Sequence, residues 1–83
     1  MYEIFITETA EKTLDKLPVQ IAERLIKAIY KLADQPRSPK CVKLSGSESY
    51  RIRVGNYRII YSILDDVLVV EALKVGNRRD VYK

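Results

Sequence analysis

The stretch SYRIRVGNYRIIY, residues 49–61, carries the strongest fold signal in the chain. Its apolar residues alternate with arginines as far as Gly55-Asn56, and the alternation resumes after that pair. A period of two is typical of a strand with one buried face, and Gly-Asn between two such runs is typical of a two-residue hairpin turn. The stretch therefore predicts two antiparallel strands, with tyrosines and aliphatic side chains on the buried face.

The same register predicts where the arginines of this hairpin lie. A two-residue turn at Gly55-Asn56 places Arg53 opposite Arg58, and Arg51 shares their face. Like charges opposite each other destabilise a sheet by up to roughly 1 kcal/mol per pair. A cluster with this cost indicates an anionic ligand, and phosphate suits the guanidinium group best because it accepts paired hydrogen bonds. An ordinary solvated sheet face is the alternative interpretation.

Length and composition favour one small folded domain over residues 1–83. Hydrophobic residues make up 47% of the chain and charged residues 31%, which is ordinary for a globular protein. The net charge of +4 is uneven, because residues 1–36 carry −1 and residues 37–83 carry +5. The positive charge therefore gathers in the strand-rich half.

The residues before and after the hairpin complete an α+β fold. Thr7 is a plausible N-cap for a first helix, and Pro18 suits the start of a second, amphipathic helix of about 15 residues. We expect an N-terminal strand, a two-helix hairpin and then an antiparallel meander, with the helices on one face of a single sheet. The expected strands cover 2–6, 42–44, 49–54, 57–64 and 67–75, with a loop at 34–40 and turns at 55–56 and 65–66.

Residue content argues against several classes of protein. Cys41 is the only cysteine and the sequence has no histidine, so neither an internal disulfide nor a Cys/His zinc site is expected. No apolar run approaches the roughly 20 residues that cross a bilayer. We expect a cytoplasmic protein without cofactor or membrane partner.

Two motifs then identify a family resemblance. KLSGSESYRIRVGNYRIIYSI, followed after the second turn by LKVGNRRDVY, resembles the RelE/ParE superfamily of toxins from type II toxin–antitoxin modules, and the RelE branch most closely. The resemblance implies a ribosome-dependent endoribonuclease that cuts mRNA in the ribosomal A site. It also implies catalytic roles for the following residues: Arg51, Arg53, Arg58, Arg78 and Tyr82. Lys40, Lys43 and Arg79 are expected to contact mRNA or the ribosome.

The sequence does not identify the general base, the group that would accept the proton of the 2′-hydroxyl. Arginine has a pKa above about 12, so it stabilises charge on the phosphate well and accepts a proton poorly. Some relatives carry lysines at positions 51 and 53, others use a histidine, and Asn77 stands where many relatives have that histidine. The candidates, in order, are Tyr82, then Glu71 or Asp80, then catalysis by charge and alignment alone.

The resemblance also implies partners and competing functions. A cognate antitoxin protein would neutralise the toxin by wrapping the domain, and operator DNA would be bound only through the antitoxin complex. The alternatives are a ParE-like poison of DNA gyrase and a catalytically weak relic that only binds its antitoxin.

Overall fold

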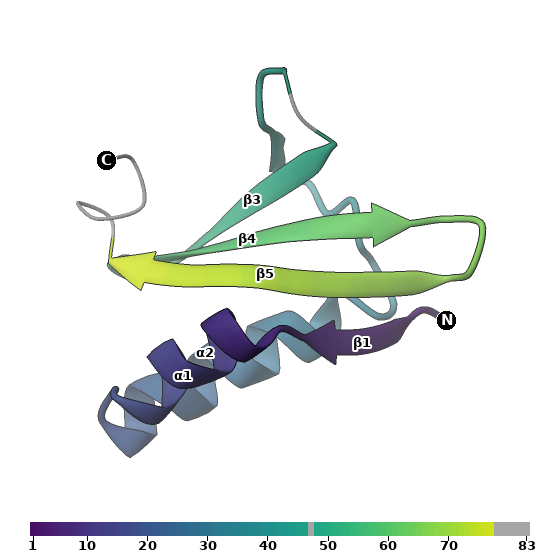
Figure 1. Ribbon diagram of the computed structural model, residues 1–83. Helices are drawn as coiled ribbons and strands as arrows, with labels where there is room; N and C mark the ends of the chain where they lie inside the picture. The colour runs from purple at the N-terminus through teal and green to yellow at the C-terminus, as the bar shows by residue number, and fades with distance from the viewer. Residues whose placement is uncertain (47, 78–83) are drawn as a thin grey trace.

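Five strands form a single mixed sheet, and both helices cover one of its faces (Figure 1). The computed structural model describes residues 1–46 and 48–77. The strand order is β1-β5-β4-β3-β2, in which β1 runs parallel to β5 and all other pairs are antiparallel. The elements are β1 (Glu3–Ile6), α1 (Glu8–Asp15), α2 (Val19–Lys31), β2 (Val42–Lys43), β3 (Ser49–Val54), β4 (Tyr57–Leu64) and β5 (Val69–Asn77). The predicted α+β architecture is confirmed.

The two helices begin where the sequence predicts. The hydroxyl oxygen of Thr7 accepts a hydrogen bond from the Ala10 amide at 3.2 Å and caps α1. The same hydroxyl donates to the carbonyl oxygen of Leu73 at 2.9 Å, so the cap also ties α1 to β5. Pro18 precedes α2, which buries Leu25 and Ile29 against the sheet.

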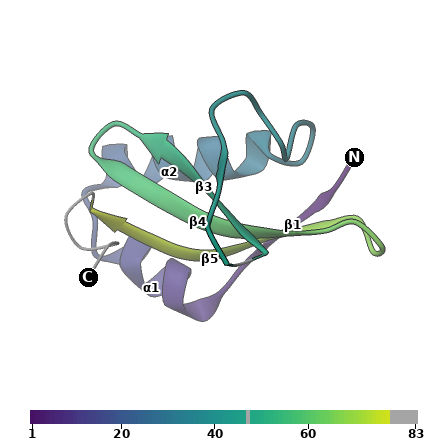
Figure 2. The same ribbon diagram turned by 90° about the horizontal axis from the view of Figure 1, so that it is seen from above.

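A continuous apolar core lies between the helices and the sheet. The view from above shows the sheet lying over both helices (Figure 2). The most deeply buried side chains come from both layers, and burial of each such side chain stabilises the fold by about 1.5–3 kcal/mol. They include Leu25, Ile29, Ile59, Tyr61 and Val70.

The central hairpin has the predicted register. Val54 pairs with Tyr57 and Arg53 pairs with Arg58, so the turn contains only Gly55 and Asn56. Gly55 has φ +60°, a left-handed conformation that glycine adopts without steric cost. The arginines of β3 and β4 therefore lie on the face opposite the helices.

The second turn differs from the prediction. Leu64 pairs with Val69, so four residues, 65–68, form the turn, and β5 covers 69–77 instead of 67–75. The physical reason lies in Asp65, whose carboxylate is held by Arg37 outside the strand pairing. Leu68 closes the turn with φ 54°.

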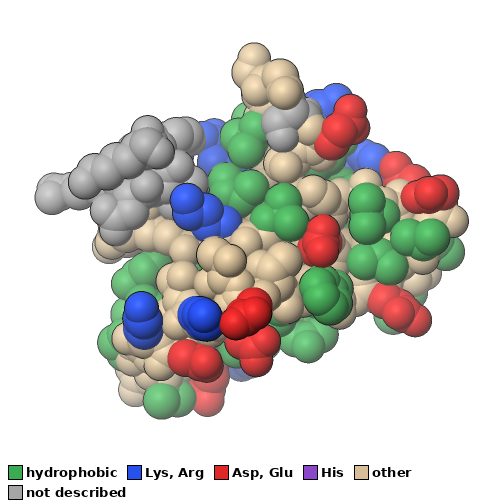
Figure 3. All heavy atoms as spheres, viewed as in Figure 1, with side chains coloured by type: hydrophobic (Ala, Val, Ile, Leu, Met, Phe, Trp, Pro, Cys, Tyr) green, Lys and Arg blue, Asp and Glu red, His purple; other side chains and the backbone are tan. Residues whose placement is uncertain are grey.

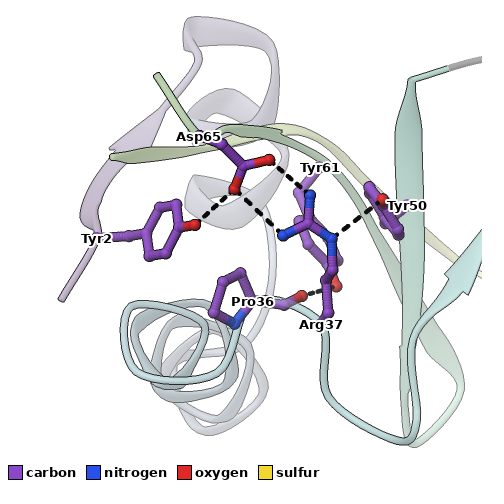
Figure 4. A network of polar contacts seen from close by, with 6 residues as sticks. All are labelled: Tyr2, Pro36, Arg37, Tyr50, Tyr61 and Asp65. Atoms are coloured by element: carbon purple, nitrogen blue, oxygen red, sulfur yellow. Dashed lines mark hydrogen bonds and ion pairs between the residues drawn. The ribbon is translucent and has the colours of Figure 1, made fainter. Parts of the chain in front are cut away.

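A network of polar contacts lies beside this turn (Figure 4). Arg37 donates from Nη1 and Nη2 to the two carboxylate oxygens of Asp65, at 3.2 and 2.8 Å. The Tyr2 hydroxyl donates to the same carboxylate at 2.5 Å, and Arg37 Nε donates to the Tyr50 hydroxyl at 3.3 Å. These four residues, together with Tyr61, are called the Arg37 clasp below.

Tyr61 joins the clasp from inside the core. Its hydroxyl donates to the carbonyl oxygen of Pro36 at 2.7 Å, and its ring stacks on that of Tyr50 with centroids 5.9 Å apart. The guanidinium of Arg37 lies 5.6 Å from the centre of the Tyr50 ring. The clasp therefore fastens the loop after α2 to β3, to β4 and to the β4–β5 turn.

Candidate active site

Four basic residues share the open face of the sheet at the end that carries the β3–β4 turn. Cross-strand partners lie on the same face, so the pairing of Arg53 with Arg58 and of Arg51 with Ile60 places all three arginines together. Ile60 in turn pairs with Lys74 of β5. We call this set, Arg51, Arg53, Arg58 and Lys74, the basic face.

The arginines of the basic face differ in exposure. Arg53 is exposed and Arg51 is half-buried, but Arg58 retains only 4% of its accessible surface. Arg58 therefore shares the face of the other two arginines, as predicted, but is not open to solvent. The reason is its position, because β4 is flanked on both sides by β3 and β5, whereas Arg53 lies on a part of β3 that β2 does not cover.

A buried guanidinium is well placed to stabilise an anion. Charges in a protein interior interact several times more strongly than in water, because little solvent screens them. The burial of Arg58 also fixes its direction before any ligand arrives, which is the condition for effective stabilisation of a developing charge. Arg53, at the exposed rim, is free to meet a phosphate from solvent.

Lys74 is the basic-face residue that sequence reasoning missed. Strict alternation from Val70 and Ala72 would turn Lys74 toward the helices. The ladder shifts register after Ile60, however, so that Tyr61 pairs with Ala72 and Leu73 is the extra residue of a bulge. The bulge turns Lys74 outward, where it is exposed.

The tyrosines of the hairpin lie on the helix side, as predicted. Tyr50 and Tyr57 pack against the core and Tyr61 is fully buried within it. Burial raises the pKa of Tyr61 above the ordinary tyrosine value. None of these three rings is available on the open face to stack on a base or to accept a proton.

Glu71 lies on the open face, but away from Arg58. It pairs with Ser62 of β4, which is four residues along the strand from Arg58, about 13 Å at strand rise. On its other side it pairs with Phe5 of β1, whose ring is exposed. Within residues 1–46 and 48–77, Glu71 forms no ion pair. Its role as a base stays a prediction.

Neither of the two predicted lysine contacts belongs to the basic face. Lys43 pairs with Tyr50 and so occupies the helix side of the short edge strand β2, where it is exposed. Lys40 is exposed in the loop before β2 and lines a groove beside α2. The structure therefore does not bring either lysine together with Arg51 and Arg58.

Three predicted site residues, Arg78, Arg79 and Tyr82, lie outside the described residues, as does the alternative base Asp80. Across the described part of the chain, no group of three or more acidic or cysteine side chains is arranged to hold a metal ion. Neither α1 nor α2 has the length and apolar character that a membrane crossing requires.

Exposed side chains divide the surface seen in Figure 3. On the face shown, several basic side chains lie toward the left and others lie at the upper right beside acidic ones, while many hydrophobic side chains lie toward the centre and right. Phe5, Leu64, Val67 and Leu68 are exposed hydrophobic residues of the molecule.

Comparison with known proteins gives a consistent result. The model of the ParE toxin family of type II toxin–antitoxin systems, parDE, matches residues 4–82. Toxin RelG of Mycobacterium tuberculosis is 30% identical over 99% of this chain and 97% of its own length. The mRNA interferase toxin RelE of Escherichia coli K12 is 29% identical over 98% of this chain and 90% of its own length. In the crystal structure of the RelBE2 toxin–antitoxin complex from Mycobacterium tuberculosis, a chain superimposes with a TM-score of 0.83 at 29% identity, covering 93% of this chain and 98% of that one.

Proposed function

Because the chain belongs to the ParE toxin family of type II toxin–antitoxin systems, we propose that it is an endoribonuclease toxin that cuts mRNA in the ribosomal A site. The observation that carries the proposal is the basic face, with the buried Arg58 between the exposed Arg53 and Lys74. The name of the Escherichia coli relative, an mRNA interferase, supports the choice of mRNA as the substrate.

The proposed reaction is attack by the 2′-hydroxyl of one nucleotide on the neighbouring phosphate. The bond from the 2′-oxygen to phosphorus forms as the bond from phosphorus to the 5′-oxygen breaks, and the proton lost by the nucleophile is matched by one gained by the leaving group. Negative charge grows on the phosphate oxygens in between. Arg58 and Arg51 would stabilise that charge, and Arg53 would hold the phosphate at the rim.

For proton transfer we propose residues that follow β5 in the sequence. Tyr82 is the leading candidate for the base, and Arg78 is the leading additional cation. Glu71 is a weaker candidate for the base, because its register position is about 13 Å along the strand from Arg58. Catalysis by charge and alignment alone is the remaining alternative.

A cognate antitoxin is the proposed regulator. The structural relative described above was solved as a toxin–antitoxin complex. By analogy, a small protein partner would cover the basic face, keep the toxin silent in the cytoplasm and bind operator DNA on behalf of the complex. Such a partner needs acidic segments to match the charge of the basic face.

A translation reaction with a defined mRNA tests the proposed function. RNA 5′ ends are mapped by primer extension with and without ribosomes, using the wild type, Arg53→Ala and, as a control at the end of α1, Lys16→Ala. We expect cuts within A-site codons that need ribosomes, weaken with Arg53→Ala and persist with Lys16→Ala. Intact mRNA in every reaction would refute the nuclease proposal.

The name of the matching family favours one competing function. ParE-like action would trap cleaved DNA on gyrase and leave mRNA intact. Purified protein, gyrase and supercoiled plasmid distinguish the two activities. Linear DNA that accumulates with the wild type and equally with Arg53→Ala would establish gyrase poisoning and exclude a need for the basic face.

A further inference from the structure

A groove adjoins the basic face and runs between α2 and the edge of β3. Five basic side chains line it, against the single acidic side chain of Glu23: Arg24, Lys27, Lys31, Lys40 and Arg53. None of these five side chains forms an ion pair with any residue that the structure describes. The groove therefore holds positive charge that the fold itself does not neutralise.

Three of these basic side chains form a row along α2. Arg24, Lys27 and Lys31 follow one another at intervals of three and four residues, so they lie on one face of the helix. They span about 10 Å along its axis. Opposite them, β2 pairs with β3 only as far as Arg51, which leaves the rest of the β3 edge uncovered beside the groove.

The groove is continuous with the basic face. Arg53 belongs to both, since it lines the groove and shares the open face with Arg58. The guanidinium of Arg24 reaches the β3–β4 turn, where its Nη1 atom lies 3.6 Å from the position that a β-carbon on Gly55 would occupy. Positive charge thus passes from the open face, around the end of the hairpin, to α2.

We propose that this groove binds the phosphodiester backbone of the same RNA strand whose scissile phosphate lies on the basic face. The inference rests on the proposed function and extends it to a second contact surface. A row of cations along a helix matches a ligand with regularly repeated anions, and its continuity with the basic face favours RNA over an acidic peptide. The lining contains no aromatic side chain, so recognition is of the backbone and independent of sequence.

Two charge-matched double variants test the proposal. Lys27→Gln/Lys31→Gln removes two charges from the groove, and Lys12→Gln/Lys16→Gln removes two from exposed positions on and directly after α1. The probe is a fluorescently labelled single-stranded RNA of about 12 nucleotides, methylated at every 2′-oxygen so that it cannot be cleaved. Its affinity for the full chain is measured over a series of salt concentrations, without ribosomes.

Loss of two phosphate contacts predicts a definite change. The slope of log affinity against log salt should fall by about 1.4 in Lys27→Gln/Lys31→Gln, and affinity near 0.1 M salt should fall by about 10- to 30-fold. Lys12→Gln/Lys16→Gln should bind like the wild type. Equal weakening in both double variants would show a general charge effect and overturn the groove assignment, as would no RNA binding by the wild type.

A second probe, a labelled decaglutamate peptide, distinguishes the other class of ligand. If the groove variant loses the peptide and keeps the RNA, the groove takes an acidic protein segment and the proposal is wrong. Failure of the proposed function has a different signature, because mRNA would then stay intact in the translation reaction whatever the salt slope of RNA binding.

Discussion

The Arg37 clasp and the basic face both contain arginine, but the surroundings of the arginines differ. In the clasp, the guanidinium of Arg37 donates two hydrogen bonds to the carboxylate of Asp65. The Tyr2 hydroxyl donates to the same carboxylate, and the Tyr50 hydroxyl accepts from Arg37 Nε. On the basic face, three arginines and Lys74 share one end of the sheet, and among the described strand residues the nearest acidic one by register is Glu71, about 13 Å along the strand from Arg58. One region balances its charge and the other accumulates it.

The difference indicates which region serves stability and which serves binding. A matched arginine joins two loops at little electrostatic cost, and its contacts are complete without a ligand. Facing arginines on neighbouring strands oppose the fold, because like charges repel. A phosphate would reverse that repulsion. Changes in the clasp should therefore alter stability and leave activity intact, and changes in the basic face should do the reverse.

The largest expected effect is that of Arg58→Gln, which keeps the size of the side chain and removes its charge. Cleavage of a translated mRNA should slow by about 10²–10³, the usual effect of removing one preorganised charge-stabilising donor. Circular dichroism of the purified variant checks the fold. A folded variant that cuts within tenfold of the wild-type rate would remove Arg58 from the site, and a retained rate in Arg58→Lys would show that charge alone suffices.

A smaller effect on the cleavage rate is expected for Lys74→Gln, which removes the basic-face charge that the bulge turns outward. Lys74 is exposed, so solvent screens its field and its contribution is about 1 kcal/mol, or roughly five- to tenfold in cleavage rate. Lys12→Gln on α1 is the control and should leave the rate unchanged. An equal rate for all three proteins would limit the site to the arginines.

In the clasp, Tyr61→Phe removes only the hydroxyl that donates to Pro36. The free energy of unfolding should fall by about 1 kcal/mol, because a carbonyl loses its partner, and the midpoint of thermal unfolding should drop by about 4–8 °C. The rate of mRNA cleavage should not change. Tyr30→Phe, at an exposed position on α2, should alter neither quantity. A large loss of activity in Tyr61→Phe would break the proposed division of roles.

The mildest expected effect concerns the pH dependence of the clasp. Hydrogen bonds from Arg37 and Tyr2 lower the pKa of Asp65 to about 2, below the value of about 3.9 in an unfolded chain. The carboxylate therefore stabilises the fold above about pH 4, and this stabilisation is lost as the pH falls toward 2. Wild type should unfold at a higher temperature than Asp65→Asn at pH 7, with the two converging near pH 2. A constant difference across that range would contradict the assignment.

Local patterns in the sequence predicted the central hairpin well, because alternation and the Gly55-Asn56 turn are encoded within a few residues. The exposure of each arginine was not predictable in the same way. It depends on how far the neighbouring strands extend, because β4 is flanked by both β3 and β5, whereas β2 covers β3 only as far as Arg51. The bulge at Leu73 was also not predictable from the sequence, because Leu73 continues an apolar run. Only the strand pairing shows that Lys74, the next residue, turns outward.

Other features depend on contacts between residues far apart in the chain. Arg37 lies in a proline-containing loop and Asp65 in a turn, 28 residues later, and nothing local to either one indicates the other. The groove beside α2 arises because β2 is too short to cover β3. Arg78 and Tyr82 come from the family resemblance alone, and their roles remain predictions.

The parallel pairing of β1 with β5 has a consequence for how the protein is made. The first strand finds its place in the sheet only beside the last, with Glu3 aligned to Val69 and Ile6 to Ala72. Contacts between such distant residues form late and slow the folding of small domains. A nascent chain on the ribosome therefore lacks the completed sheet until β5 has been synthesised. By this order of assembly, a protein whose proposed target is the translating ribosome would gain its complete basic face only after β5, which carries Lys74, has been synthesised.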